Sequence, residues 1–129
     1  MAGKSRMETV LVVEDEADVR TLVSRTLELE GYRVLQAMDG EAGLKVLTET
    51  RVDLVLLDLL LPVLDGWAVL QRIKENPELK AAPVIVFTAS ASLQKREEAF
   101  KLGASEYLMK PLNLDDLIKT VRRVLRSRR

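Results

Sequence analysis

Short apolar segments alternate with longer amphipathic segments five times along the chain. The apolar segments are nearly continuous and rich in β-branched residues, which is typical of strands covered on both faces. The segments between them repeat apolar residues at helical spacing. The predicted strands are Thr9–Val13, Arg33–Ala37, Val52–Leu57, Val84–Thr88 and Tyr107–Met109. Five strand–helix units predict an α/β fold, a doubly wound parallel sheet with strand order 2-1-3-4-5.

Glycine and proline mark where the predicted helices end. Gly31 and Gly103 follow the first and fourth helices, as residues without a Cβ often do, and Pro77 cannot continue the third. The predicted helical patterns are Val19–Leu29, Ala42–Leu47, Trp67–Ile73, Leu93–Leu102 and Leu114–Leu125. We interpret residues 8–129 as one domain and the polar residues 1–7 as a flexible leader.

Composition excludes several classes of site. The 129 residues contain neither cysteine nor histidine, which rules out disulfides, thiol catalysis, zinc sites built from those residues and any imidazole base. Lys plus Arg and Asp plus Glu number 20 each, so net charge does not favour nucleic acid, and no segment is apolar enough for a membrane span. We expect a cytoplasmic protein without direct nucleic-acid contact, and we attribute the basic residues 119–129 to the dipole of the last helix.

Reactive side chains follow the predicted strands. They are Glu14, Asp15 and Glu16 after the first strand, Asp58 after the third, Thr88 at the end of the fourth and Lys110 after the fifth. Ligands bind at this edge of a doubly wound sheet, because the carboxyl ends of its parallel strands meet there. Because the first and third strands are neighbours, three of the carboxylates converge, those of Glu14, Asp15 and Asp58. With Lys110 they leave a formal charge of minus two, which Mg²⁺ would balance. A carboxylate beside such an ion can act as a nucleophile and form an aspartyl phosphate.

The ordered motifs closely resemble the receiver domain of two-component response regulators. They are VLVVEDE, LVLLD with Pro62 and Gly66 four and eight residues later, FTAS, and LGASEYLMKP. Together they extend from Val10 to about Leu125. The resemblance implies a flavodoxin-like (βα)5 receiver fold and a signalling role. It also implies that the chain is not an enzyme, beyond self-catalysed phosphorylation and dephosphorylation.

The resemblance implies a role for each residue of the acidic site. Asp58 would accept a phosphoryl group from a phosphohistidine on a partner histidine kinase or histidine phosphotransfer protein. Asp15 and Asp58 would bind Mg²⁺ directly, or Mn²⁺ in its place, with Glu14 acting through water and Leu60 through its backbone carbonyl. No cofactor other than the metal ion is expected.

The resemblance also implies how a signal would leave the site. Thr88 and Lys110 would contact the phosphoryl oxygens, and Tyr107 would turn inward as Thr88 moves toward them. The bond between Lys110 and Pro111 would be cis, which proline makes accessible. The surface formed by the last two helices and the strand between them, about Leu93–Leu125, would then change. It would control a downstream protein or a tethered output domain, and it is where a homodimer would form.

The sequence departs from the family pattern at the first acidic position, where Glu14 stands in place of the commoner aspartate. The segment LPVLDG keeps the turn residues of the family motif. Leu60 and Ser90 lie where the family tunes dephosphorylation. Because an apolar Leu60 cannot hydrogen-bond an attacking water, we expect an altered phosphoryl lifetime.

Each residue has an ordinary alternative. Asp15 could cap the first helix, Asp58 could be a loop carboxylate, and Thr88 could be a plain strand residue. Lys110 could be a solvated surface lysine, and Tyr107 a half-buried strand aromatic. For the whole chain, the alternatives are a flavin- or nucleotide-binding protein, a metal-dependent phosphatase, and a receiver-like docking or dimerisation scaffold. The EDEAD loop argues against the first, because it would repel a phosphate, and Leu60 occupies the position where the second would need an acid or base.

Overall fold

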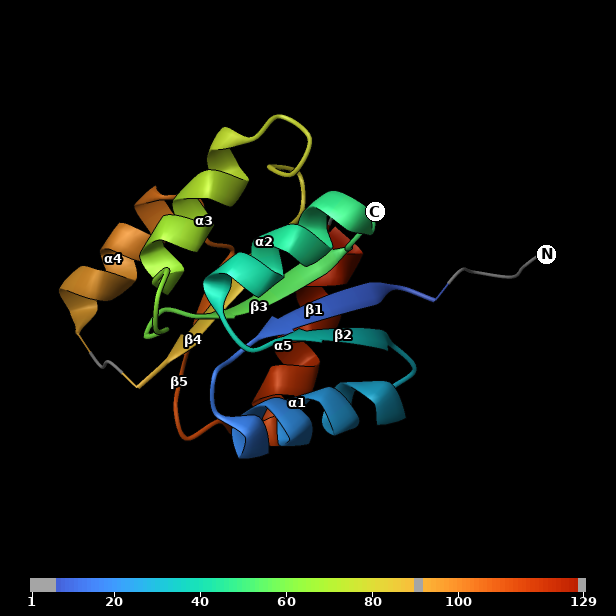
Figure 1. Cartoon of the computed structure of the whole chain (residues 1–129). Coiled ribbons are helices and arrows are strands. Elements are labelled where there is room, and N and C mark those ends of the chain that lie inside the picture. Colours follow the sequence, from blue (N-terminus) through green and yellow to red (C-terminus); the bar gives the residue numbers. More distant parts are fainter. Residues whose placement is uncertain (1–6, 90–91, 128–129) are drawn as a thin grey trace.

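The five apolar strands form one parallel sheet in the order β2-β1-β3-β4-β5, as the sequence predicted. The computed structural model describes residues 7–89 and 92–127 (Figure 1). The strands are β1 (Thr9–Val13), β2 (Arg33–Ala37), β3 (Leu54–Asp58), β4 (Val84–Thr88) and β5 (Glu106–Met109). Most of the predicted leader, Ser90 and the last two arginines lie outside the described residues, so the expectations for them stay predictions.

Helices cover both faces of the sheet (Figure 1). They are α1 (Ala17–Leu29), α2 (Gly40–Glu49), α3 (Gly66–Glu75), α4 (Leu93–Lys101) and α5 (Leu114–Ser127). Alternate residues of each strand point to opposite faces, so a buried parallel strand contributes to two cores. Val10 and Val12 pack with α1 and α5, whereas Leu11 and Val13 pack with α2, α3 and α4.

Four of the helices begin at a side chain that caps the first turn, and in α5 the cap is Asn113, which accepts the backbone N–H of Asp116. Asp39 accepts a hydrogen bond from the backbone N–H of Ala42, and Asp65 accepts one from Ala68. Ser92 does the same for α4. Such caps satisfy backbone donors that have no partner inside the helix. In α3 this fixes the helix start directly after the loop that follows β3.

The element boundaries differ slightly from the sequence prediction. Val52 and Asp53 precede β3, and Asp58 is its last residue rather than the residue after it. The buried Asp53 carboxylate accepts the backbone N–H of Thr9 at 2.8 Å, and the Asp53 N–H donates to the Thr9 carbonyl at 2.8 Å, so both its side chain and its backbone bond to the start of β1. At the other end of the chain, α5 continues to Ser127.

Ser24 of α1 is buried, and its Oγ has no hydrogen-bond partner among the described residues. A buried hydroxyl without a partner costs stability, and alanine has a higher helix propensity than serine. We therefore expect Ser24→Ala to raise the free energy of unfolding by about 1 kcal/mol in urea titrations. A loss of stability would mean that the hydroxyl is hydrogen-bonded in solution.

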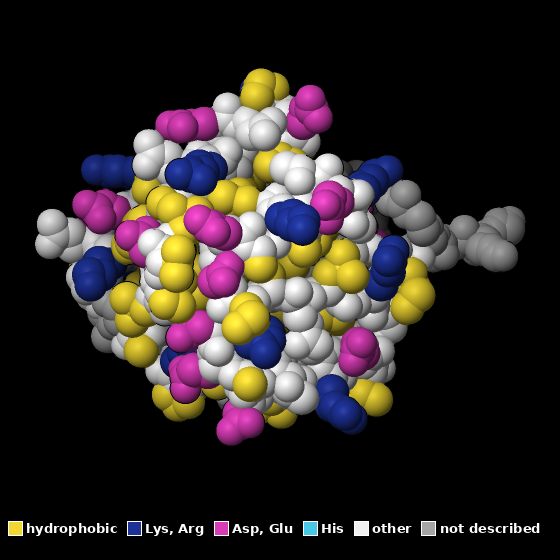
Figure 2. All heavy atoms as spheres, in the orientation of Figure 1, with side chains coloured by type: hydrophobic (Ala, Val, Ile, Leu, Met, Phe, Trp, Pro, Cys, Tyr) yellow, Lys and Arg dark blue, Asp and Glu magenta, His cyan; other side chains and the backbone are white. Residues whose placement is uncertain are grey.

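The surface carries both signs of charge. Figure 2 shows acidic and basic side chains interspersed over the face seen in Figure 1, with apolar side chains between them. Two arginines of α5 form ion pairs, Arg122 with Glu30 and Arg123 with Glu106. Part of the basic stretch near the end of the chain is thus paired with carboxylates of the same molecule. Within residues 7–89 and 92–127, no helix is long and apolar enough to cross a membrane.

Candidate functional site

Three carboxylates gather where β1 and β3 end. Glu14 directly follows β1 and is fully buried, and the buried Asp58 ends the neighbouring β3. The register pairs Val13 with Leu57, which places the next residue of each strand at the same edge. Asp15 is exposed, yet one oxygen of each of the three carboxylates lies within 4.8 Å of the others. The sequence prediction that these side chains converge is confirmed.

Lys110 reaches into this cluster from the end of β5. Its Nζ lies 2.5 Å from Glu14 Oε1 and 2.9 Å from Asp58 Oδ2, and the side chain is only 16% exposed. The same nitrogen lies 5.3 Å from the centre of the Phe87 ring. Contacts of this kind compensate buried charges that would otherwise be costly. The alternative of a solvated surface lysine is therefore wrong.

The environment shifts the pKa values of two of these groups. Burial raises the pKa of Glu14, with the charge of Asp58 acting in the same direction, while hydrogen bonds from Lys110 and from the Glu16 backbone oppose it. For Lys110, burial alone would lower the pKa, but its hydrogen bonds and charge interactions with Glu14 and Asp58 outweigh burial and raise it. The lysine therefore stays charged at neutral pH, and the fold disfavours the charged form of Glu14.

Replacing Glu14 with glutamine is expected to stabilise the protein in EDTA at pH 7, by on the order of 1 kcal/mol. The amide removes a disfavoured buried charge, while Lys110 keeps its contact with Asp58. A carboxyl group whose folded pKa is raised regains stability as the pH falls through that pKa. The advantage of the variant should therefore shrink toward pH 4.5.

Urea unfolding at several pH values measures this difference, and Glu28→Gln, an exposed change on α1, is the control. A Glu14→Gln variant that is less stable than the unchanged protein at pH 7 would contradict the electrostatic account.

The Asp58 carboxylate is held at both oxygens. Oδ2 accepts from Lys110, and Oδ1 accepts the backbone N–H of Leu60 at 3.0 Å. Behind it, Gly66 packs directly on the Asp58 backbone, where an added methyl group would overlap the Asp58 carbonyl and the Leu59 Cα. The contact explains why α3 needs glycine as its first residue. Asp58 is itself a buried strand residue, so the alternative that it is an ordinary loop carboxylate is wrong.

Thr88 ends β4 beside the cluster. It is fully buried, and its Oγ1 has no hydrogen-bond partner among the described residues. Buried hydroxyls are rarely left in this state, so Thr88 has an unused donor at the edge where the carboxylates lie. Tyr107 lies in β5, paired with Val86, and is buried with 9% exposed. The peptide bond between Lys110 and Pro111 is cis, as the resemblance implied.

Sequence reasoning missed the place of Glu16 in this cluster. Its Oε1 lies 3.7 Å from Lys110 Nζ, and its backbone N–H donates to Glu14 Oε2 at 2.9 Å. Glu16 is also the N-cap residue of α1, so the alternative that Asp15 caps this helix is wrong. The run of three acidic residues was the only signal for Glu16, and it does not show which of them turn toward Lys110.

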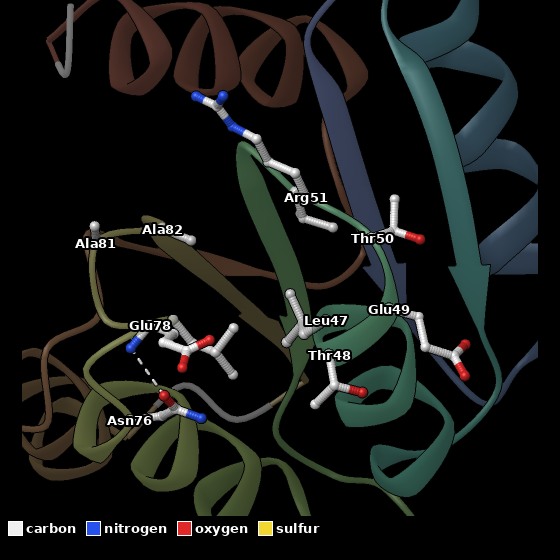
Figure 3. A pocket seen from close by; sticks show the side chains of 11 residues that line it. Leu47, Thr48, Glu49, Thr50, Arg51, Asn76, Glu78, Ala81 and Ala82 are labelled. Atoms are coloured by element: carbon white, nitrogen blue, oxygen red, sulfur yellow. Dashed lines mark hydrogen bonds between the residues drawn. The ribbon is translucent and has the colours of Figure 1, made fainter.

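A cavity of about 490 Å³ lies elsewhere, between the C-terminal ends of α2 and α3 (Figure 3). Its lining includes Thr50 and Val52, which precede β3, and Ala82, which precedes β4. These residues lie at the amino ends of the strands, whereas the acidic cluster lies at the carboxyl ends. Glu49 and Glu78 line the cavity together with Arg51. The cavity contains none of the predicted site residues.

Residues 10–122 match the family model described as the response regulator receiver domain. The chain belongs to this family. Receiver domains of response regulators are in general signalling domains of two-component systems rather than enzymes. The acidic cluster therefore lies in a fold where such clusters generally bind Mg²⁺, and its ligand atoms are all oxygens, which suit that ion.

Curated relatives and solved structures agree with this assignment. Over 120 residues the chain is 37% identical to the "DNA-binding dual master transcriptional regulator RpaA" of Synechocystis, covering 93% of this chain and 50% of RpaA. It is 40% identical to the transcriptional regulatory protein PrrA of Mycobacterium leprae, covering 92% of the chain and 50% of PrrA. The receiver chain thus spans about half the length of these curated relatives.

Among solved structures, the chemotaxis protein CheY4 of Vibrio cholerae is similar with a TM-score of 0.87 and 34% identity, covering 92% of this chain and 99% of CheY4. A CheY-like receiver domain protein of Methanospirillum hungatei has a TM-score of 0.89 and 28% identity, covering 95% and 97% of the two chains. Both similarities extend over nearly the whole receiver fold.

Proposed function

We propose that this receiver domain is a phosphorylation-driven switch in which Asp58 accepts a phosphoryl group. The donor is a phosphohistidine of a partner histidine kinase or histidine phosphotransfer protein. One observation carries the proposal: the buried Asp58 carboxylate is fixed between Lys110 Nζ and the Leu60 N–H, inside a cluster of three carboxylates. Receiver domains receive phosphoryl groups from such donors in the cytoplasm, and we propose the same location for this domain.

The chemistry follows from the positions of the side chains. An oxygen of Asp58 attacks the phosphorus atom of the phosphohistidine, a new oxygen–phosphorus bond forms, and the nitrogen–phosphorus bond breaks with its electron pair left on the imidazole. The protein's contribution is to position the groups and to neutralise charge on the phosphoryl oxygens. Lys110 supplies a permanent positive charge there, and Thr88 supplies a buried hydroxyl that has no hydrogen-bond partner within the described part of the chain.

A divalent ion fits the remaining charge. The three converging carboxylates, Glu14, Asp15 and Asp58, with Lys110 have formal charges that sum to minus two, and Mg²⁺ balances that sum. The Glu16 carboxylate is left out of the sum because its side chain is 65% exposed to water. We assign direct binding to Asp15 and Asp58, water-mediated binding to Glu14, and one ligand to the Leu60 carbonyl, with Mn²⁺ as a substitute. When bound, the ion neutralises charge on the phosphoryl oxygens.

In the proposed switch, phosphorylation of Asp58 on β3 changes the surface around β5, and β4 lies between these two strands. Thr88 reorients toward the phosphoryl oxygens, and the Tyr107 side chain turns inward into the space that Thr88 leaves. Pro111 forms the turn that follows β5. The output surface is the face of α4, β5 and α5, where Leu93, Phe100 and Met109 are exposed apolar residues. It controls a downstream protein or a tethered output domain, and it is where a homodimer would form. No direct contact with nucleic acid by this domain is part of the proposal.

A groove beside Lys110 supports docking of the phosphoryl donor. It has a volume of about 460 Å³ and runs between α1 and the segment after the cis peptide bond. Its apolar lining comes from Val19, Leu22, Val23, Ala89, Pro111, Leu112 and Leu114. An apolar, concave surface next to the acceptor suits a protein partner, because burial of apolar area drives such association.

Beryllofluoride, a stable mimic of the phosphoryl group, tests the switch in amide NMR spectra recorded with Mg²⁺. We expect amide shifts at the acidic cluster and along α4, β5 and α5, and none in Asp58→Asn. Thr88→Val should keep the shifts at the cluster and lose those on the output surface. Shifts confined to the cluster in the unchanged protein would overturn the switch and favour a docking scaffold.

A further inference from the structure

Arg20, one turn into α1, reaches back to the loop that carries the acidic residues. Its Nη1 donates a hydrogen bond to the backbone carbonyl of Glu14 at 2.8 Å and a longer one to that of Asp15 at 3.4 Å. The side chain is half-buried, so part of its charge is removed from water. The guanidinium thus bonds to the backbone of both acidic residues and not to their carboxylates, whose contacts with Lys110 and with the Glu16 N–H come from other groups.

The other side of the guanidinium is anchored on β2. Arg20 Nε donates to Gln36 Oε1 at 3.3 Å, and the backbone N–H of Glu14 donates to the Ala37 carbonyl at 3.0 Å. The loop between β1 and α1 is therefore tied to β2 directly and also through Arg20. A lysine could not reproduce this arrangement, because only arginine presents several donors in a rigid planar fork.

The carboxylates of this loop repel one another, so a contact that fixes the backbone helps to hold them together without occupying a carboxylate oxygen. We propose that Arg20 is a positioning residue that fixes the backbone of Glu14 and Asp15 so that their carboxylates converge on a divalent cation. The inference rests on the metal-dependent function proposed above. Groups that orient metal ligands in this way typically contribute about tenfold to a hundredfold in metal affinity.

The test is the affinity of each variant for Mn²⁺, measured by electron paramagnetic resonance of the free ion. Thermal unfolding in EDTA shows that each variant is folded. We expect Arg20→Lys and Arg20→Gln to bind Mn²⁺ about tenfold more weakly. Arg25→Lys, at an exposed arginine of the same helix, is the control and should bind as the unchanged protein does. If Arg20 acted only through its charge, Arg20→Lys would bind normally and Arg20→Gln would bind more tightly, which overturns the positioning role.

The outcomes separate this inference from the proposed function. If the unchanged protein does not bind Mn²⁺, or binds it equally well as Asp15→Asn, the metal site fails and the inference fails with it. If the unchanged protein binds Mn²⁺ through Asp15 and Arg20→Lys binds equally well, only the role of Arg20 is overturned. Gln36→Ala leaves the arginine in place and removes its anchor, so a weaker affinity in that folded variant supports positioning, and an unchanged affinity contradicts it.

Discussion

Replacing Lys110 with methionine is expected to lower the free energy of unfolding by about 3 kcal/mol at pH 7, the lower end of the range for breaking a buried ion pair from one side. The change leaves Glu14 and Asp58 buried at the end of the sheet without the ammonium that contacts both. Methionine keeps most of the volume of the side chain, so the loss reports charge rather than packing.

The pH dependence of the stability loss in Lys110→Met shows whether the loss is electrostatic. The pKa of Lys110 is raised in the fold, so its contribution is present through neutral pH and is lost only as the pH rises through that value. In the variant, the unpaired carboxylates take up protons on acidification, and the stability deficit should narrow. Urea unfolding at several pH values measures it, with Lys101→Met on the exposed face of α4 as a control expected within about 0.5 kcal/mol of the unchanged protein. A deficit that does not change with pH would contradict this explanation.

Replacing Gly66 with alanine is the second large effect we expect, with a loss of about 3 kcal/mol, the upper end of the range for overpacking. The added methyl group would overlap the Asp58 carbonyl and the Leu59 Cα, both backbone atoms that cannot turn away. The collision can be relieved only by moving the end of β3, which carries the acceptor. Phosphorylation of Asp58 by acetyl phosphate should therefore slow as well.

Gly31→Ala separates this collision from the general cost of losing a glycine. Gly31 has a φ of 96°, and nothing lies within 4 Å of an added Cβ there. The cost at Gly31 should be the backbone strain alone, about 1 kcal/mol. Thermal or urea unfolding of both variants gives the comparison. Equal losses of unfolding free energy at the two positions would contradict the prediction, because the contact between Gly66 and the Asp58 backbone would then add nothing to the cost of the substitution.

The sheet and the general position of the site could be predicted from the sequence, because both depend on local patterns. Nearly continuous apolar strands separated by helical segments favour one topology, and parallel strands of that topology end at one edge. This is why the sequence alone places Glu14, Asp58 and Lys110 together, although they are separated by up to 96 residues.

Other features depend on how separate segments meet, and the sequence does not show them. The motifs place Lys110 near the carboxylates, but they do not show how far its charge is removed from water; in the fold only 16% of its side chain is exposed. Val63, in the loop after β3, has a φ of 65°, a conformation that a β-branched residue rarely adopts. The contact of Arg20 with the carbonyls of Glu14 and Asp15 likewise follows from the path of the loop rather than from any motif.

The intact mass of the protein after incubation with acetyl phosphate tests the central claim most directly. Samples with Mg²⁺ and with EDTA are compared with Asp58→Asn, and Asp65→Asn serves as the matched control because asparagine caps a helix as well as aspartate does. The account predicts one added phosphoryl group that requires Mg²⁺, persists in Asp65→Asn and is absent from Asp58→Asn. An adduct that survives in Asp58→Asn or forms in EDTA, or no mass change with either acetyl phosphate or beryllofluoride, would contradict it.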